Sequence, residues 1–206
     1  MRPSSSHFLA VAAVAVAFAI PAAAAAEPVP VQGFISPMGE PFHARLGLPY
    51  PSADWFAKAD ADHDGVVTRE EFRADAMRFF KTLDVNADGR INDAEVNRYE
   101  HVVAPEIVAA AVDTSALSLQ ATGDGEDGPK HTMLSTQRQG AAFFGLLNDA
   151  EPVRSADTDF NMKVTQDEWL AAADRRFRSL DAAGKGGLRL ADLPVTPTQA
   201  QFARQK

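Results

Sequence analysis

Two stretches of the chain place oxygen-bearing side chains at the same spacing. The sequence DADHDGVVTREE runs from Asp60 to Glu71 (loop one), and DVNADGRINDAE runs from Asp84 to Glu95 (loop two). Each has such a side chain at positions one, three, five and twelve, and a glycine at position six. A hard cation such as Ca²⁺ prefers six to eight oxygen ligands, and the glycine permits the sharp turn that lets the side chains converge. The spacing therefore predicts a divalent-cation site in each loop.

The backbone carbonyl at position seven and the group at position nine complete the predicted ligand set, the latter directly or through water. The predicted calcium ligands are Asp60, Asp62, Asp64, Val66, Thr68, Glu71, Asp84, Asn86, Asp88, Arg90, Asn92 and Glu95. An acidic surface loop is the alternative interpretation. Two matches in tandem, each followed by a helical pattern, favour two Ca²⁺ sites.

A third stretch, DTDFNMKVTQDE from Asp157 to Glu168 (loop three), keeps the oxygen pattern but has Met162 where the glycine is expected. Holding a residue other than glycine at positive φ costs about 1 kcal/mol, so we expect some distortion of this loop. Two interpretations stay open: a weaker third Ca²⁺ site, or a loop without an ion. The ligands of such a site would be Asp157, Asp159, Asn161, Lys163, Thr165 and Glu168.

A fourth stretch, DAAGKGGLRLAD from Asp181 to Asp192 (loop four), keeps the outline and loses the ligands. Lys185 and Arg189 stand at positions five and nine, where cationic side chains would repel Ca²⁺, so we expect no metal there. One hypothesis is that one of these two cations takes the place of the ion between Asp181 and Asp192. The alternative is that both side chains point into water.

The four loops resemble EF-hand calcium loops, and the chain resembles bacterial secreted or periplasmic EF-hand domain proteins. The resemblance implies calcium binding, an α-helical fold and no catalytic activity. We therefore predict an all-α EF-hand fold with two closely spaced pairs of hands, shared central helices and short strands that join paired loops. In EF-hands the residue at position eight lies on that strand, and here it is aliphatic in every loop: Val67, Ile91, Val164 and Leu188.

An internal repeat predicts how the loops are arranged. The interval from residue 60 to residue 157 equals that from 84 to 181, which indicates two homologous halves. Residues 71–83 and 168–180 contain no Gly or Pro, so each span should form one helix that leaves one loop and enters the next. Such a helix is about 20 Å long and keeps its two loops apart. We therefore expect antiparallel packing of the two helices, with loop one facing loop four and loop two facing loop three.

The remaining segments complete the predicted domain organisation. Arg2, an apolar run over 8–20 and alanines up to residue 26 are typical of a cleaved signal peptide, with an uncleaved anchor as the alternative. The expected order is a signal peptide (1–26), an extended Pro-rich arm (27–52), EF-hand pair one (53–112), a flexible linker (113–139), and EF-hand pair two with a C-terminal tail (140–206). Residues 140–153 are expected to form a buried helix. The predicted localisation is periplasmic or secreted.

The amino-acid composition argues against several classes of function. A formal charge of −8 argues against nucleic acid or an anionic membrane surface as partner, and the absence of cysteine excludes disulfides and thiol chemistry. No nucleophile motif or phosphate loop is present, so we expect no enzyme. The favoured function is a calcium-stabilised structural or buffering module outside the cytoplasm. The alternative is a calcium-responsive interaction protein that binds an unidentified protein partner through an exposed hydrophobic groove.

Overall fold

The computed structural model describes residues 31–110 and 138–204. The predicted signal peptide (1–26) and residues 113–137 of the predicted linker lie outside the described residues. Within the described ranges, no helix has both the length and the apolar character needed to cross a membrane.

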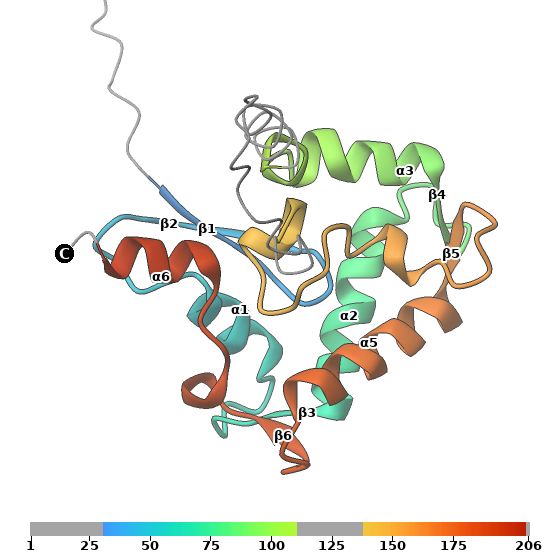
Figure 1. The fold of residues 1–206 in the computed structure, drawn as a ribbon. Helices are drawn as coiled ribbons and strands as arrows, with labels where there is room; N and C mark the ends of the chain where they lie inside the picture. The colour runs from blue at the N-terminus through green and yellow to red at the C-terminus, as the bar shows by residue number, and fades with distance from the viewer. Residues whose placement is uncertain (1–30, 111–137, 205–206) are drawn as a thin grey trace, which may run out of the picture.

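Two long helices form the centre of the fold (Figure 1). They are α2 (Arg69–Leu83) and α5 (Gln166–Leu180). The rings of Phe72 and Phe177 lie 5.7 Å apart, and those of Phe80 and Trp169 lie 5.9 Å apart. The start of each helix thus contacts the end of the other, so the pair is antiparallel. Helix α2 runs from the end of loop one to the start of loop two, and α5 does the same for loops three and four.

Two short antiparallel ribbons join the loops at opposite ends of this helix pair (Figure 1). They are β3 (Val67–Thr68) with β6 (Gly187–Leu188), and β4 (Arg90–Asn92) with β5 (Lys163–Thr165). Val67 faces Leu188 and Ile91 faces Val164, so the residues at position eight pair directly. All four are buried. The predicted pairing of loop one with loop four, and of loop two with loop three, is confirmed.

Shorter helices surround the central pair. They include α1 (Ser52–Ala59), α3 (Asp93–Arg98), a π-helical turn (Tyr99–Val103), 3-10 turns (Gly140–Phe143, Arg154–Ala156, Leu190–Asp192) and α6 (Pro197–Ala203). Helix α1 enters loop one and α3 leaves loop two. Loop three is entered by a single 3-10 turn, so the second pair of hands is the less regular one.

The prediction of an all-α fold with an extended arm is wrong for residues 31–45. This segment forms an antiparallel hairpin of β1 (Val31–Ile35) and β2 (Pro41–Arg45). The prolines that suggested an extended arm do not prevent pairing, because both strands of a two-stranded ribbon are edges and Pro is tolerated at the first residue of an edge strand. Gly39, at φ +98°, makes the turn.

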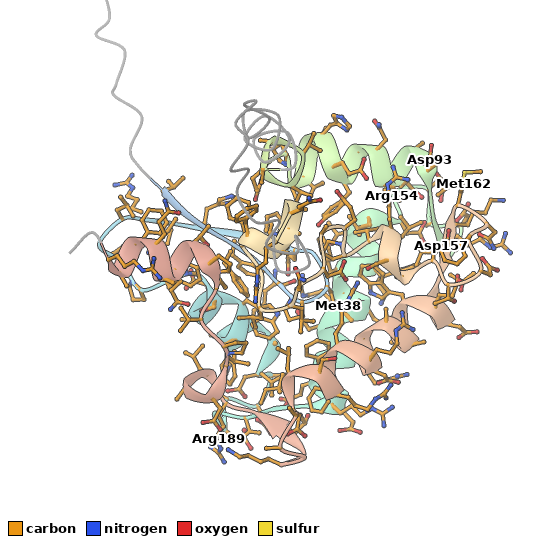
Figure 2. All side chains as sticks on the ribbon, in the orientation of Figure 1. Met38, Asp93, Arg154, Asp157, Met162 and Arg189 are labelled. Atoms are coloured by element: carbon orange, nitrogen blue, oxygen red, sulfur yellow. The ribbon has the colours of Figure 1, made fainter. Side chains whose placement is uncertain are left out.

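The hairpin turn is part of the core and not a surface arm. Phe34, Ile35 and Met38 are 0%, 1% and 2% exposed, and the ring of Phe34 lies 5.9 Å from that of Trp55. Figure 2 labels Met38 near the centre of the molecule, and the Arg176 side chain of α5 donates to its sulfur at 3.3 Å. The hydroxyl of Tyr99 donates a hydrogen bond of 2.8 Å to the Gly39 carbonyl. The hairpin therefore fills the space beside the central helices.

The predicted buried helix over 140–153 is also wrong. Only Gly140–Phe143 is helical, and as a 3-10 turn. Gly140 has a φ of +52°, and the Ala141 N–H donates to the Ala150 carbonyl at 3.0 Å, so the segment closes on itself as a loop. A side chain at Gly140 would meet the Ala150 oxygen at 2.5 Å. The apolar composition reflects burial of this loop, and burial alone does not select a helix.

A half-buried glutamate with one unpaired oxygen, Glu151, lies just before loop three. Arg154 donates to Glu100 at 2.6 Å and Arg176 donates to Asp149 at 2.8 Å, so each guanidinium already has an acidic partner. Oε2 of Glu151 is buried and has no hydrogen-bond partner among the described residues. Burial, and then the neighbouring charge of Glu100, raises the pKa of Glu151 to about 7 from an ordinary 4.5.

Replacing Glu151 by Gln should stabilise the protein at pH 8 and have little effect at pH 4. The folded state binds this proton more tightly than the unfolded state, so the Glu151 carboxylate lowers the free energy of unfolding as pH rises from about 4.5 to about 7. The full shift corresponds to about 3 kcal/mol. Solvent screening of this half-buried group reduces the expected gain to about 1–2 kcal/mol.

Urea unfolding of both proteins at pH 4 and pH 8 measures this difference. Glu70→Gln, at an exposed position on α2, is the control and should show no such pH dependence. An equal effect of Glu151→Gln at both pH values would contradict the assignment.

Candidate metal centre

Loop one begins where α1 ends. The Asp60 carboxylate accepts hydrogen bonds from the backbone N–H groups of Asp64 at 3.2 Å and Gly65 at 3.0 Å. These bonds curl the backbone so that positions three and five turn toward position one. Gly65 has a φ of +83° and His63, at position four, a φ of +58°. The loop therefore needs left-handed conformations at positions four and six.

Position twelve is placed by the start of the following helix. Thr68 accepts a hydrogen bond from the Glu71 N–H, and Glu71 Oε2 accepts one from the Thr68 N–H at 2.9 Å, which together form a capping box. Oε1 of Glu71 accepts from the Ala61 N–H at 2.9 Å, back at the start of the loop. One glutamate thus caps α2 and faces the loop with its second oxygen. The T-x-x-E signature from Thr68 to Glu71 is the sequence signal for this cap, and the ligand spacing alone does not reveal it.

Loop two repeats this arrangement. Asp84 accepts from the N–H groups of Asp88 at 3.1 Å and Gly89 at 2.9 Å. Glu95 accepts from the N–H groups of Asn92 at 2.9 Å and Val85 at 2.8 Å, and Asn92 caps α3 as Thr68 caps α2. Both loops therefore curl the backbone around the aspartate at position one and bring the glutamate at position twelve back to the start of the loop.

The EF-hand family model matches residues 53–77 and 76–98. The matches support an EF-hand calcium-binding domain. The first contains all of α1 but its first residue, loop one and the start of α2, and the second contains the end of α2, loop two and α3. The two matches meet inside α2, the helix that both hands share. No curated protein matches the chain.

The third hand keeps the same geometry despite Met162. This residue adopts a φ of +63°, close to the +79° of Gly89. Its N–H donates to Asp157 at 2.9 Å, and the Glu168 carboxylate accepts from the N–H groups of Thr165 and Thr158, both at 3.0 Å. The expected distortion is therefore absent from loop three as described.

The glutamate at position twelve is ionised in loops one and three. Hydrogen bonds from the backbone and hydroxyl of Thr68 lower the pKa of Glu71. Burial alone would raise the pKa of Glu168, but hydrogen bonds from Thr165 and Thr158 outweigh it and lower the value to about 2. Metal binding requires the carboxylate form of such ligands. Both side chains hold that form at neutral pH.

The described donor sets fit Ca²⁺. Carboxylate oxygens of Asp60, Asp62 and Glu71 lie within 4.8 Å of one another, and so do those of Asp157, Asp159 and Glu168. Loop two offers two aspartates and a glutamate with an amide at position three. Oxygen donors without nitrogen or sulfur suit a hard cation. A bound ion would supply the positive charge that holds these mutually repelling oxygens together.

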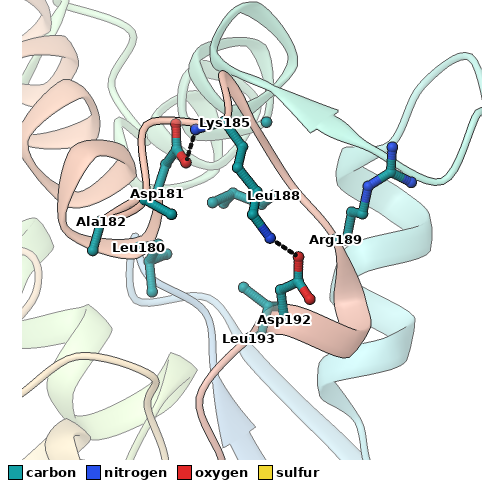
Figure 3. Close-up of a pocket in the computed structure, with 10 residues that line it drawn as sticks. Leu180, Asp181, Ala182, Lys185, Leu188, Arg189, Asp192 and Leu193 are labelled. Atoms are coloured by element: carbon teal, nitrogen blue, oxygen red, sulfur yellow. Dashed lines mark hydrogen bonds and ion pairs between the residues drawn. The ribbon is translucent and has the colours of Figure 1, made fainter.

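The fourth hand contains a lysine where the others have a ligand. The Lys185 ammonium lies 2.9 Å from Asp192, and Figure 3 shows its side chain reaching across the loop. Arg189 points away from both acids in the same view. Asp181 still accepts from the N–H groups of Lys185 at 2.7 Å and Gly186 at 2.8 Å. The hypothesis of a cation between Asp181 and Asp192 is therefore met in part: the Lys185 ammonium pairs with Asp192, the Asp181 carboxylate accepts backbone N–H groups, and Arg189 takes no such place.

Proposed function

We propose that the protein binds Ca²⁺ through loops one, two and three, and that it acts outside the cytoplasm as a calcium-stabilised structural or buffering module. The EF-hand matches support calcium binding at loops one and two. The matching hydrogen-bond geometry and carboxylate cluster of loop three support a third ion. The pattern of the first 26 residues supports the location. Extracellular calcium modules work at dissociation constants of about 10⁻⁴ to 10⁻³ M.

The hairpin supports a structural module over a responsive one. Sensor hands open on binding calcium and expose an apolar groove for a partner. Here Phe34, Ile35 and Met38 fill the space beside the central helices. Arg78 on α2 pairs with Glu40 beside the hairpin turn. The chain thus supplies its own apolar segment, and calcium would stabilise a core that is already closed.

One observation favours the alternative, a calcium-responsive interaction protein. Phe160 and Met162 in loop three are 87% and 70% exposed. Beside them lies a cavity of about 350 Å³ whose lining includes Val96 and Val164. Figure 2 places Met162 at the outer edge of the molecule. This apolar patch is small beside the buried hairpin core, so it ranks second.

Calorimetric titration of residues 27–206 with Ca²⁺ tests the proposal, with a hydrophobic dye followed in parallel. We expect three ions per chain and no calcium-dependent dye uptake. Glu168→Gln should reduce the number to two, since it removes the carboxylate that closes loop three. Strong calcium-dependent dye binding would favour the interaction protein. No heat of binding at millimolar Ca²⁺ would refute the proposal as a whole.

We propose no enzymatic role for the protein. The two clusters of three acidic side chains found among the described residues both belong to the calcium loops. The same group cannot hold Ca²⁺ and exchange a proton with a substrate in one step.

A further inference from the structure

Lys185 stands at position five of loop four, where loops one and two have aspartate. Its flexible four-carbon side chain reaches Asp192 at position twelve, where Lys185 Nζ lies 2.9 Å from Asp192 Oδ2. This ion pair links the middle of loop four to its last residue. In a calcium-loaded loop the bound ion makes that connection.

Other features of loop four fit this closure. Asp192 is shorter than glutamate, and a cation brought to it by a side chain needs no long carboxylate. Within the described residues no side-chain hydrogen bond caps the 3-10 turn at Leu190–Asp192, so Asp192 has no capping role and is free to pair with the lysine. Gly184 and Gly186 take the left-handed conformations at positions four and six, at φ +64° and +80°, without a side-chain penalty.

Without calcium, the repulsion between acidic side chains therefore differs between the loops that the two ribbons join. Ribbon β4–β5 joins two acidic loops whose cations, Arg90 and Lys163, stand at position seven and make no ion pair with a loop acid among the described residues. Ribbon β3–β6 joins one acidic loop to a loop that carries its own ammonium. Val67 and Leu188 pair across this second ribbon and are buried.

We propose that Lys185 is a built-in cation that holds loop four folded and, through ribbon β3–β6, keeps loop one ordered when calcium is absent. Ribbon β4–β5 has no such support and forms fully only with calcium. Ribbon β3–β6 then stays formed without calcium, whereas the formation of ribbon β4–β5 depends on calcium. The unequal response rests on the proposed calcium function, whereas the role of Lys185 does not.

Amide hydrogen exchange of the protein in excess chelator tests this inference. We expect slower exchange in β3 and β6 than in β4 and β5. Lys185→Gln should speed exchange in β3 and β6 by about two- to five-fold, as expected for loss of an exposed ion pair. It should leave β4 and β5 unchanged.

Arg189→Gln is the matched control, because it removes a cation from the same loop that does not face the acids. Equal effects of the two variants, or equal exchange in the two ribbons of the parent protein, would overturn the proposal. Adding Ca²⁺ tests the proposed calcium function separately from the role of Lys185. If exchange in β4 and β5 does not slow, the calcium function fails, while the comparison of variants in chelator still decides the role of Lys185.

Discussion

Glu71→Gln and Glu95→Gln should each remove one Ca²⁺ from the titration and leave the fold intact. The position-twelve glutamate supplies two oxygens and a full negative charge to the ion. Glutamine offers one carbonyl oxygen and no charge. Its carbonyl still accepts from the backbone N–H of the capping residue, so helices α2 and α3 keep their starts. The variants thus separate calcium binding from folding.

The expected loss is at least about 100-fold in affinity for the altered loop. Changing a group that merely orients a metal ligand costs about 10- to 100-fold, and these substitutions change the ligand itself. Calorimetry gives the number of ions and circular dichroism checks the helices. Glu70→Gln, next to Glu71 but exposed, removes the same charge and should leave both sites at full strength. If Glu71→Gln binds as many ions as the parent, loop one is not a calcium site.

Phe34→Ala should destabilise the protein by about 3–5 kcal/mol, the usual cost of emptying a buried phenylalanine site. Phe34 is fully buried and its ring contacts those of Trp55, Tyr50 and Phe42. The same change should loosen the hairpin and open the apolar space beside the central helices. We therefore expect hydrophobic-dye binding that the parent protein lacks.

Phe160→Ala is the matched control for this prediction. It removes the same side chain from a site that is 87% exposed, so its effect on stability should stay within about 0.5 kcal/mol. Chemical unfolding in saturating Ca²⁺ compares the two variants on equal terms. Similar stability of the two variants would show that the hairpin does not close the core.

The loop pairing could be predicted from the sequence because it depends on spacing. The equal intervals between the loops and the two Gly- and Pro-free helices leave few ways to bring Val67 to Leu188 and Ile91 to Val164. The hairpin could not be predicted in this way. Its strands are short, and Pro41 suggested an extended segment although an edge strand tolerates it. The partners that stabilise it, such as Tyr99, are distant in sequence.

The candidate ligands could likewise be predicted from spacing alone. The backbone conformation of Met162 and the ion pair of Lys185 could not. Met162 accepts a left-handed conformation because hydrogen bonds to Asp157 and the capped start of α5 hold the loop around it. Lys185 and Arg189 are both cations in one loop, and only the folded geometry shows that Lys185 reaches Asp192. The conformational preference of a residue type applies to each residue separately. The contacts in the folded protein determine which conformation Met162 adopts and which acid Lys185 reaches.

Each ribbon takes one strand from either half of the chain, and this exchange makes the halves interdependent. A half by itself would expose two strand edges and the apolar faces of its long helix. It would therefore need a second copy, related by a two-fold axis, to cover them. The present molecule has the topology of such a homodimer joined into one polypeptide. Loop four pairs with loop one across β3–β6, and it carries Lys185 against Asp192 where its equivalent in the first half, loop two, has Asp88 at position five.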